Sequence, residues 1–256
     1  GNQKPLKFNI NNFPKFKDKI EYLVIENEPK DIIRKTIISS SEKRINSILR
    51  IEQSYNCMMK SIKNASDNDL ICYSDNDEIP NFESKQFKNS KKNILIFKQH
   101  FFYYKFNLFY DLMPWYGTKA CKKKKLINLS WLRNLKNKKY SAWRLDTLFS
   151  KTKQTDLEII NDGGWHFTNI KTAKDIFIKL SNFGHHNEFD ESGVTVQDIQ
   201  NCINSRIVNY NHQADKTNEA KYKANYKLKI ISDQILPKYL IKNKIKYKEW
   251  FDFDLK

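Results

Sequence analysis

An acidic turn after a short apolar run is the stretch of the sequence best suited to chemistry. Residues 70–73 (LICY) are followed directly by residues 74–80 (SDNDEIP). Asp75, Asp77 and Glu78 crowd three carboxylates into this turn, where their charges repel one another unless a cation lies among them. Carboxylate oxygens are the natural ligands of hard cations such as Mg²⁺ and Mn²⁺. The turn therefore predicts a divalent-cation site, and the alternative is a solvated Asp/Asn turn before Pro80.

A second turn, residues 162–167 (DGGWHF), combines an acid with two glycines and an aromatic residue. Paired glycines let the backbone approach a ligand closely, and Trp165 can form an apolar platform against a sugar ring or a base. Asp162 is the candidate general base of this turn, and His166 is a candidate ligand or base. The alternative is a β-turn with a core tryptophan.

Two adjacent histidines and a glutamate occur in residues 183–188 (FGHHNE). Neutral imidazole binds Mn²⁺ and Zn²⁺, so one of these histidines is a candidate metal ligand. The alternative is a helix C-terminus at which histidine interacts with the helix dipole. Taken together, the three turns indicate a metal-dependent site for an anionic, phosphate-bearing substrate.

Short apolar strands and amphipathic helices are expected to position these turns. We expect strands over 20–25, 70–73, 94–109 (as one strand or two) and 157–160. We expect helices from about 40 to 65 and over 131–135, 172–183 and 196–207. Helices that alternate with short strands predict an α/β fold, and the absence of a clear linker predicts a single domain over 1–256.

The composition narrows the class of protein. Aromatic residues make up 14% of the 256 residues, which excludes intrinsic disorder. The net charge is +17, but only 6 of the 46 basic residues are arginine, the residue that nucleic-acid readers favour, so no nucleic-acid partner is expected. A positive field still favours an anionic small substrate such as a nucleoside diphosphate.

The cysteines and the hydropathy pattern bear on the compartment. The four cysteines form no CxxC pair, so we expect buried free thiols in a reducing compartment and hence a cytoplasmic protein. No apolar run reaches the roughly 20 residues of a membrane span, so no transmembrane segment is expected.

Several motifs in a fixed order resemble glycosyltransferase family 17, the family of the β-1,4-mannosyl-glycoprotein 4-β-N-acetylglucosaminyltransferases. The motifs are 74–80 (SDNDEIP), 100–107 (HFFYYKFN), 115–120 (WYGTKA), 162–167 (DGGWHF), 183–188 (FGHHNE) and 236–239 (LPKY). The chain departs from the family in two places. In the family, a first strand-helix-strand leads into a Thr-Gly-Lys-Pro-like segment. Residues 1–5 (GNQKP) resemble the tail of that segment, so the strand-helix-strand is expected to be missing. Residues 54–56 (SYN) replace a Gln-Arg-Asn-like motif, which removes one expected phosphate or acid contact. The Golgi anchor of the animal enzymes is also not seen, so a Golgi location does not carry over.

The resemblance implies a GT-A-like α/β fold and an inverting transfer of N-acetylglucosamine from UDP-N-acetylglucosamine to a glycan hydroxyl, with Mn²⁺ or Mg²⁺ as cofactor. It implies that Asp75, Asp77 and His185 hold the cation, with His186 as the substitute for His185.

The resemblance also suggests roles for the other site residues. We expect the base to be Asp162, with Glu188 second and Glu78 third. Trp165 is expected to pack against the sugar. Lys119 is a candidate for the nucleotide phosphates, with a solvated lysine as the favoured alternative.

Two other functions remain open at this point. Clustered carboxylates also serve metal-dependent phosphoryl transferases and nucleases. A basic nucleic-acid-binding protein would expose aromatic residues interleaved with lysine, as residues 103–106 (YYKF) would if they were not a buried strand.

Overall fold

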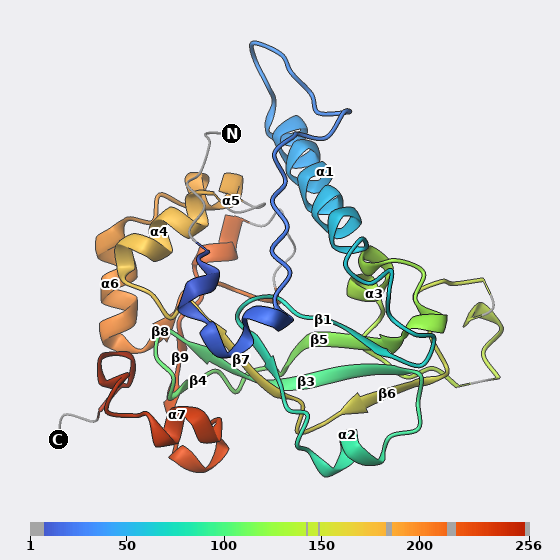
Figure 1. Cartoon of the computed structure of the whole chain (residues 1–256). Helices are drawn as coiled ribbons and strands as arrows, with labels where there is room; N and C mark the ends of the chain where they lie inside the picture. Colours follow the sequence, from blue (N-terminus) through green and yellow to red (C-terminus); the bar gives the residue numbers. More distant parts are fainter. Residues whose placement is uncertain (1–7, 142, 148, 183–185, 214–218, 254–256) are drawn as a thin grey trace.

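A long central strand, β3 (Ile94–Tyr103), organises the fold in a computed structural model that describes residues 8–141, 143–147, 149–182, 186–213 and 219–253 (Figure 1). Eight of its ten residues are buried. This burial explains why its sequence, ILIFKQHFFY, is apolar nearly throughout instead of alternating, as is usual for a strand covered on both faces.

Different strands pair with the two halves of β3. Its first half pairs in parallel with β6 (Leu157–Ile160), and its second half pairs in parallel with β7 (Gly164–Thr168). On its other edge β3 pairs antiparallel with β5 (Trp115–Lys122), with a register shift between Ile96 and Lys98, and then with β4 (Leu108–Phe109).

The remaining strands extend this sheet outward. β1 (Leu70–Tyr73) pairs with β5, β2 (Glu78–Pro80) pairs with β7, and β10 (Lys229–Ile230) pairs with β4, all antiparallel. β8 (Ile207–Val208) and β9 (Tyr226–Lys227) form a separate small ribbon. The result is a curled, mixed sheet within an α/β fold (Figure 1).

Helices cover the sheet in groups. The long helix α1 (Ser40–Met58) begins with a capping box in which Ser39 and Glu42 satisfy each other's backbone N–H groups. The other α-helices are α2 (Lys85–Asn89), α3 (Leu129–Asn134), α4 (Ala173–Ser181), α5 (His186–Ser192), α6 (Val196–Ser205) and α7 (Lys238–Lys242). Short 3₁₀ turns occupy Ile10–Asn12, Pro14–Lys19, Lys123–Lys125, Leu145–Thr147, Glu219–Tyr222, Asp233–Ile235 and Lys248–Trp250.

Alternating side chains of β3 anchor separate parts of the core. Ile94 and Ile96 pack with the end of α1 and with α3, whereas Phe97 packs near α2. Further along the strand, Phe101 packs against α4, α5 and α6, and Phe102 packs in the cluster that contains α7. The second half of β3 therefore fixes the sheet relative to α4–α6, and the candidate site lies between them.

Most of the expected elements are present. Strands 70–73 and 157–160 are confirmed, the apolar stretch 94–109 forms the two strands β3 and β4, and the helices expected near 131–135, 172–183 and 196–207 occur as α3, α4 and α6.

Three expectations are wrong. Residues 20–25 form no strand: four of the six are exposed, and no strand of the described chain pairs with them. The first helix ends at Met58 and continues as turns, with the N–H of Lys60 bonded to the carbonyl of Cys57. All four cysteines are free, as expected, but only Cys121 is buried, and Cys72 is exposed. In the described residues, no helix is long and apolar enough to cross a membrane.

Candidate functional site

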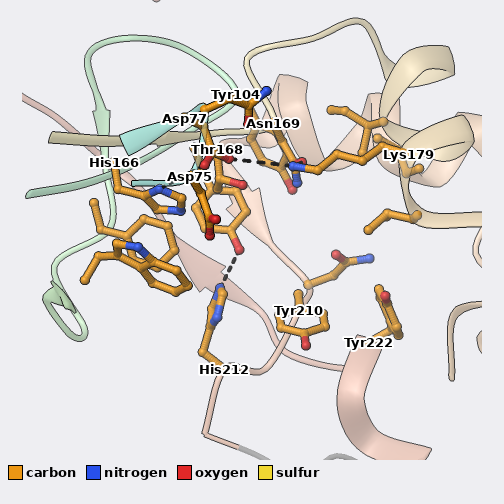
Figure 2. A pocket seen from close by; sticks show the side chains of 18 of the residues that line it. Asp75, Asp77, Tyr104, His166, Thr168, Asn169, Lys179, Tyr210, His212 and Tyr222 are labelled. Carbon is orange, nitrogen blue, oxygen red and sulfur yellow. Dashed lines mark hydrogen bonds and ion pairs between the residues drawn. The ribbon is translucent and has the colours of Figure 1, made fainter. Parts of the chain in front are cut away.

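A cavity of about 500 Å³ lies between the acidic turn, the second half of β3 with β7, and helices α4 and α6 (Figure 2). Asp75 and Asp77 line one side of it, Lys179 comes from α4, and Tyr210, His212 and Tyr222 come from the segment after α6. Acidic, cationic and aromatic groups from distant parts of the sequence therefore share one chamber. Its volume is in the range of small-molecule binding sites.

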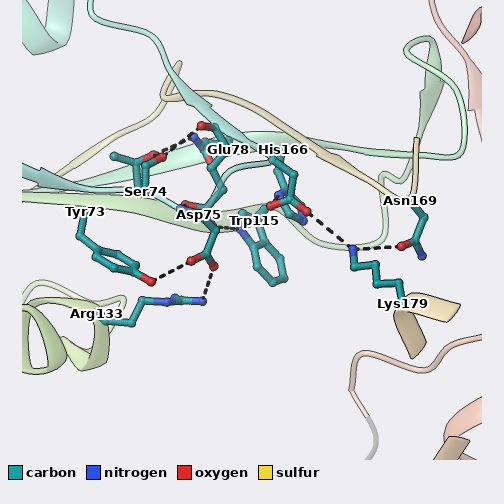
Figure 3. Close-up of polar contacts among 12 residues, drawn as sticks. Tyr73, Ser74, Asp75, Glu78, Trp115, Arg133, His166, Asn169 and Lys179 are labelled. Carbon is teal, nitrogen blue, oxygen red and sulfur yellow. Dashed lines mark hydrogen bonds and ion pairs between the residues drawn. The ribbon is translucent and has the colours of Figure 1, made fainter. Parts of the chain in front are cut away.

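Asp75 is held at the edge of the cavity by two donors. Its Oδ1 accepts a hydrogen bond of 2.9 Å from the hydroxyl of Tyr73, and its Oδ2 accepts one of 3.1 Å from Nη2 of Arg133 (Figure 3). Arg133 belongs to α3 and also lines the cavity. The first carboxylate of the turn is thus positioned by a strand residue and by a cation from a separate helix.

Glu78 fixes the shape of the acidic turn from behind. Its Oε2 accepts the N–H of Asp75 at 3.1 Å, and its Oε1 accepts the indole N–H of Trp115 at 2.7 Å (Figure 3). The hydroxyl of Ser74 donates to its backbone carbonyl at 3.0 Å. Because Glu78 is only 6% exposed and its oxygens are occupied, it acts as a scaffold residue and does not line the cavity, so the role of base expected for it is not supported.

Asp77 lies between a lysine and a histidine. Its Oδ2 is 3.9 Å from Nζ of Lys179, and its Oδ1 is 3.6 Å from Nδ1 of His166. Lys179 also donates to Oδ1 of Asn169 at 3.1 Å (Figures 2 and 3). Burial raises the pKa of Asp77, and the positive charge of Lys179 opposes that rise. The second carboxylate is therefore partly desolvated, which strengthens its interaction with any cation that enters.

His166 is a neutral, buried ring behind Asp77. It stacks on Trp115 with ring centroids 4.3 Å apart and planes 10° from parallel. Burial, reinforced by the charge of Lys179, lowers the pKa of His166 to about 3. Its Nδ1 has no hydrogen-bond partner among the described residues. The ring is thus uncharged at neutral pH, and one of its nitrogens faces Asp77 without being satisfied.

The opposite wall of the cavity is aromatic and neutral. The hydroxyl of Tyr103 is hydrogen-bonded to Nε2 of His212, and burial lowers the pKa of His212 to about 4 (Figure 2). Tyr210 and Tyr222 pack edge to face beside this pair. Such a wall offers flat apolar surfaces with hydroxyl groups, a combination suited to a sugar ring or a base.

Two residues with left-handed backbone conformation border the cavity. Tyr104 has φ 63° and Asn169 has φ 55°, and both line the chamber. Asparagine tolerates this region, but a tyrosine there is strained. The N–H of Tyr104 is bonded to the carbonyl of Thr168 at 3.2 Å, so pairing of the strand ends holds the strained residue in place. Backbone strain of this kind tends to cluster at functional sites.

The structure does not bring Asp162 to the cavity. Asp162 accepts a hydrogen bond of 3.0 Å from Asn81 at the end of β2, and its side chain is 66% exposed. Asp77, by contrast, lies beside Phe167, whose N–H is bonded to the Asp77 carbonyl at 2.8 Å. Between Asp162 and Phe167, the strand part alone, from Gly164 to Phe167, covers about 10 Å at the usual rise of an extended strand. The expected base therefore lies at the opposite end of the β2–β7 pair from the aspartates.

Trp165 and Lys119 also lie away from the cavity. Trp165 precedes His166 in β7, and consecutive strand residues point to opposite faces. Its indole donates to the carbonyl of Ile235 at 2.5 Å and packs in the α7 cluster. Lys119 is 3% exposed and donates to the carbonyls of Arg133 (2.9 Å) and Leu135 (2.6 Å) at the end of α3, while burial lowers its pKa to about 8. Neither the sugar-packing nor the phosphate-binding role is supported by these positions.

Of the other expected site residues, Glu188 lies near the aromatic wall. It belongs to α5, and its negative charge, after burial, raises the pKa of Tyr210 and contributes to the raised pKa of Tyr222. His185 lies outside the described residues, as does the side chain of His186.

The cavity includes residues that the sequence did not single out, chiefly Arg133, Lys179, Tyr210, His212 and Tyr222. Lys179 occupies a polar position of an amphipathic helix, where a lysine is ordinary, and the other four belong to no recognisable motif. The sequence therefore contains no signal for them. Within the described ranges, no three His, Cys, Asp or Glu side chains gather closely enough to form a metal site by themselves.

Comparisons with known proteins give no relative for this chain. No protein-family model matches it, and neither a curated protein nor a solved structure is significantly similar to it.

Proposed function

We propose that this chain is an inverting, metal-dependent glycosyltransferase of GT-A-like fold, which moves N-acetylglucosamine from UDP-N-acetylglucosamine to a glycan hydroxyl. The observation that carries the proposal is that Asp75 and Asp77, two residues apart after a strand, both line one cavity whose other walls are cationic and aromatic. The order of sequence motifs resembling glycosyltransferase family 17 gives the proposal its substrate. The four free cysteines are compatible with a cytoplasmic enzyme.

The donor set is compatible with a cation shared with a diphosphate. Mg²⁺ is usually bound by one or two carboxylates together with substrate phosphates and water, so a third protein ligand is not required. Asp75 and Asp77 would hold the cation, which when bound would offset the negative charge that builds on the departing UDP. Arg133 and Lys179 now neutralise these carboxylates at 3.1 and 3.9 Å, and on ligand entry they would turn to phosphate oxygens.

Since Asp162 lies away from the cavity, we take Glu188, the second expected base, as the base. In an inverting transfer, a carboxylate takes the proton from the acceptor hydroxyl as that hydroxyl attacks the anomeric carbon from the face opposite UDP. Glu188 does not itself line the cavity, but its charge acts on Tyr210 and Tyr222, which do, and these tyrosines would support the sugars.

The cation part of the proposal is tested by UDP binding and by hydrolysis of a panel of UDP-sugars. UDP should bind in Mn²⁺ or Mg²⁺ and lose affinity when a chelator is added, and Asp77→Asn should lose the same metal dependence. Asp162→Asn is the matched control, because it removes one carboxylate outside the cavity and should leave binding unchanged. Equal UDP affinity with and without chelator would refute the metal role, and cleavage of a polynucleotide instead of a UDP-sugar would favour a nuclease.

The base is tested by turnover with UDP already bound. Glu188→Gln keeps the shape of the side chain and should lower transfer by about 10²–10⁴-fold, the usual contribution of a positioned base, while UDP affinity stays the same. If Asp162→Asn lowers turnover more than Glu188→Gln does, the base assignment returns to Asp162.

A further inference from the structure

Large apolar side chains are exposed to solvent in the segment 136–153, of which residues 136–141, 143–147 and 149–153 are described. It projects beyond the sheet, after α3 (Figure 1). Trp143, Phe149 and Leu145 are 93%, 91% and 74% exposed, respectively. None of the three lines the cavity described above. Three large apolar side chains are thus exposed within seven residues of one segment, and a concentration of exposed apolar surface marks an interaction site.

A network of polar contacts holds the segment in this conformation. Asp146 accepts from Nε and Nη2 of Arg144 at 2.9 and 2.8 Å and from Nζ of Lys153 at 2.7 Å. Both cations also lie over the ring of Tyr140, at 5.5 and 5.9 Å from its centroid. The indole of Trp131 in α3 donates to the carbonyl of Lys151 at 2.6 Å. The apolar side chains are therefore exposed on a loop that has hydrogen bonds and ion pairs of its own.

The charge of the segment indicates what covers it. Residues 136–153 contain six basic side chains and one carboxylate, a net charge of +5. That carboxylate, Asp146, is engaged by Arg144 and Lys153. Four further lysines of the same segment, all exposed, form no ion pair with any described residue: Lys136, Lys138, Lys139 and Lys151. The partner must therefore combine an apolar interior with a negatively charged surface.

We propose that this segment binds the surface of an anionic lipid bilayer, inserting Trp143, Leu145 and Phe149 among the acyl chains while the four lysines contact the headgroups. Tryptophan and phenylalanine on a basic surface are typical of interfacial membrane binding, and each lysine near an anionic surface adds to the attraction. Leu145 favours the bilayer over single-stranded nucleic acid, because an aliphatic side chain cannot stack on bases. Arg133, which lines the cavity, is only three residues before this segment, so the cavity would be held close to the membrane.

Vesicle cosedimentation of the full chain tests this proposal, with vesicles of phosphatidylcholine alone or mixed with phosphatidylglycerol. The wild-type chain should sediment with the mixed vesicles, and raising the salt concentration should weaken binding because surface charge is screened. The double variant Trp143→Ser with Phe149→Ser should bind at least tenfold more weakly, since two large apolar side chains no longer leave water. Ile245→Ser, at an equally apolar and 89% exposed position elsewhere, is the matched control and should bind like the wild type.

Because the substituted side chains are exposed, all variants should unfold at the wild-type temperature, which separates lost binding from lost folding. The proposal is overturned if the wild type stays in the supernatant with anionic vesicles, or if the double variant binds them as tightly as the wild type. It is also overturned, in favour of nucleic acid, if the chain ignores vesicles but binds a single-stranded polynucleotide in a Trp143-dependent manner.

Discussion

Replacing Gly117 by alanine should destabilise the scaffold behind the acidic turn. A Cβ at this position of β5 would lie 2.0 Å from Oε1 of Gln99 and 2.7 Å from both Cδ of Glu78 and Cδ1 of Trp115. Gln99 would have to withdraw by about 1 Å to reach even the 3.0 Å below which Cβ contacts essentially never occur. Gln99 is 1% exposed, so it cannot move without displacing its neighbours.

The expected loss follows from two contributions. Overpacking a buried site costs about 1–3 kcal/mol, and weakening the hydrogen bond from Trp115 to Glu78 adds about 1 kcal/mol. The free energy of unfolding should therefore fall by about 2–4 kcal/mol. In a chain of this size each kcal/mol lowers the unfolding temperature by about 2–4 °C, so we expect a decrease of about 5–15 °C.

Thermal unfolding followed by near-ultraviolet circular dichroism measures this decrease. Gly193→Ala is the matched control, because a Cβ there meets nothing within 4 Å and only the left-handed φ of +67° carries a cost, about 1–2 kcal/mol. If Gly117→Ala unfolds at or above the temperature of Gly193→Ala, the close packing of Gln99, Glu78 and Trp115 is not as described.

Three further substitutions examine the charged and buried groups. His166 takes up a proton near its ordinary pKa of 6.5 in the unfolded chain but only near pH 3 in the folded chain, so the free energy of unfolding should fall as the pH drops from 6.5 to 3. In denaturant titrations across this range, the free energy of unfolding of His166→Phe should fall by up to about 1.4 kcal/mol less per pH unit than that of the wild type. Lys179→Met removes the charge that opposes the raised pKa of Asp77. As the pH is lowered, Asp77 of this variant should be protonated earlier, so UDP binding should be lost at a higher pH than in the wild type. A change in affinity that is the same at every pH would contradict this. Asn46→Ala breaks the bonds of 2.8 and 3.0 Å to the N–H and carbonyl of Ile33 and should cost about 1–3 kcal/mol, with faster amide exchange in the segment before α1; unchanged exchange there would count against the anchoring role.

The sequence predicts those parts of the site that depend on local order. Asp75 and Asp77 belong to one turn after one strand, and a strand that runs into an acidic turn is visible without the fold. Lys179 and His212 were not predicted, because they reach Asp77 and Tyr103 only through the docking of α4 and of the segment after β8 onto the sheet.

Two differences between expectation and structure have simple physical causes. Trp165 and His166 were both candidates for the site, but neighbouring residues of a strand face opposite sides, and only His166 faces the cavity. Residues 20–25 have strand composition, yet a strand also requires a partner with an unpaired edge, which composition does not reveal.

The parallel pairing of β3 has a consequence for synthesis of the chain. One edge of β3 stays open until β6 and β7 have been made, and Thr168, the last partner, follows Tyr103 by 65 residues. At about 5–20 residues per second, this apolar edge is unpaired for about 3–13 s on the ribosome. During that interval it can pair with another nascent chain. We therefore expect nascent chains arrested before Thr168 has left the ribosome to be cut by protease within β3, and longer ones to be protected.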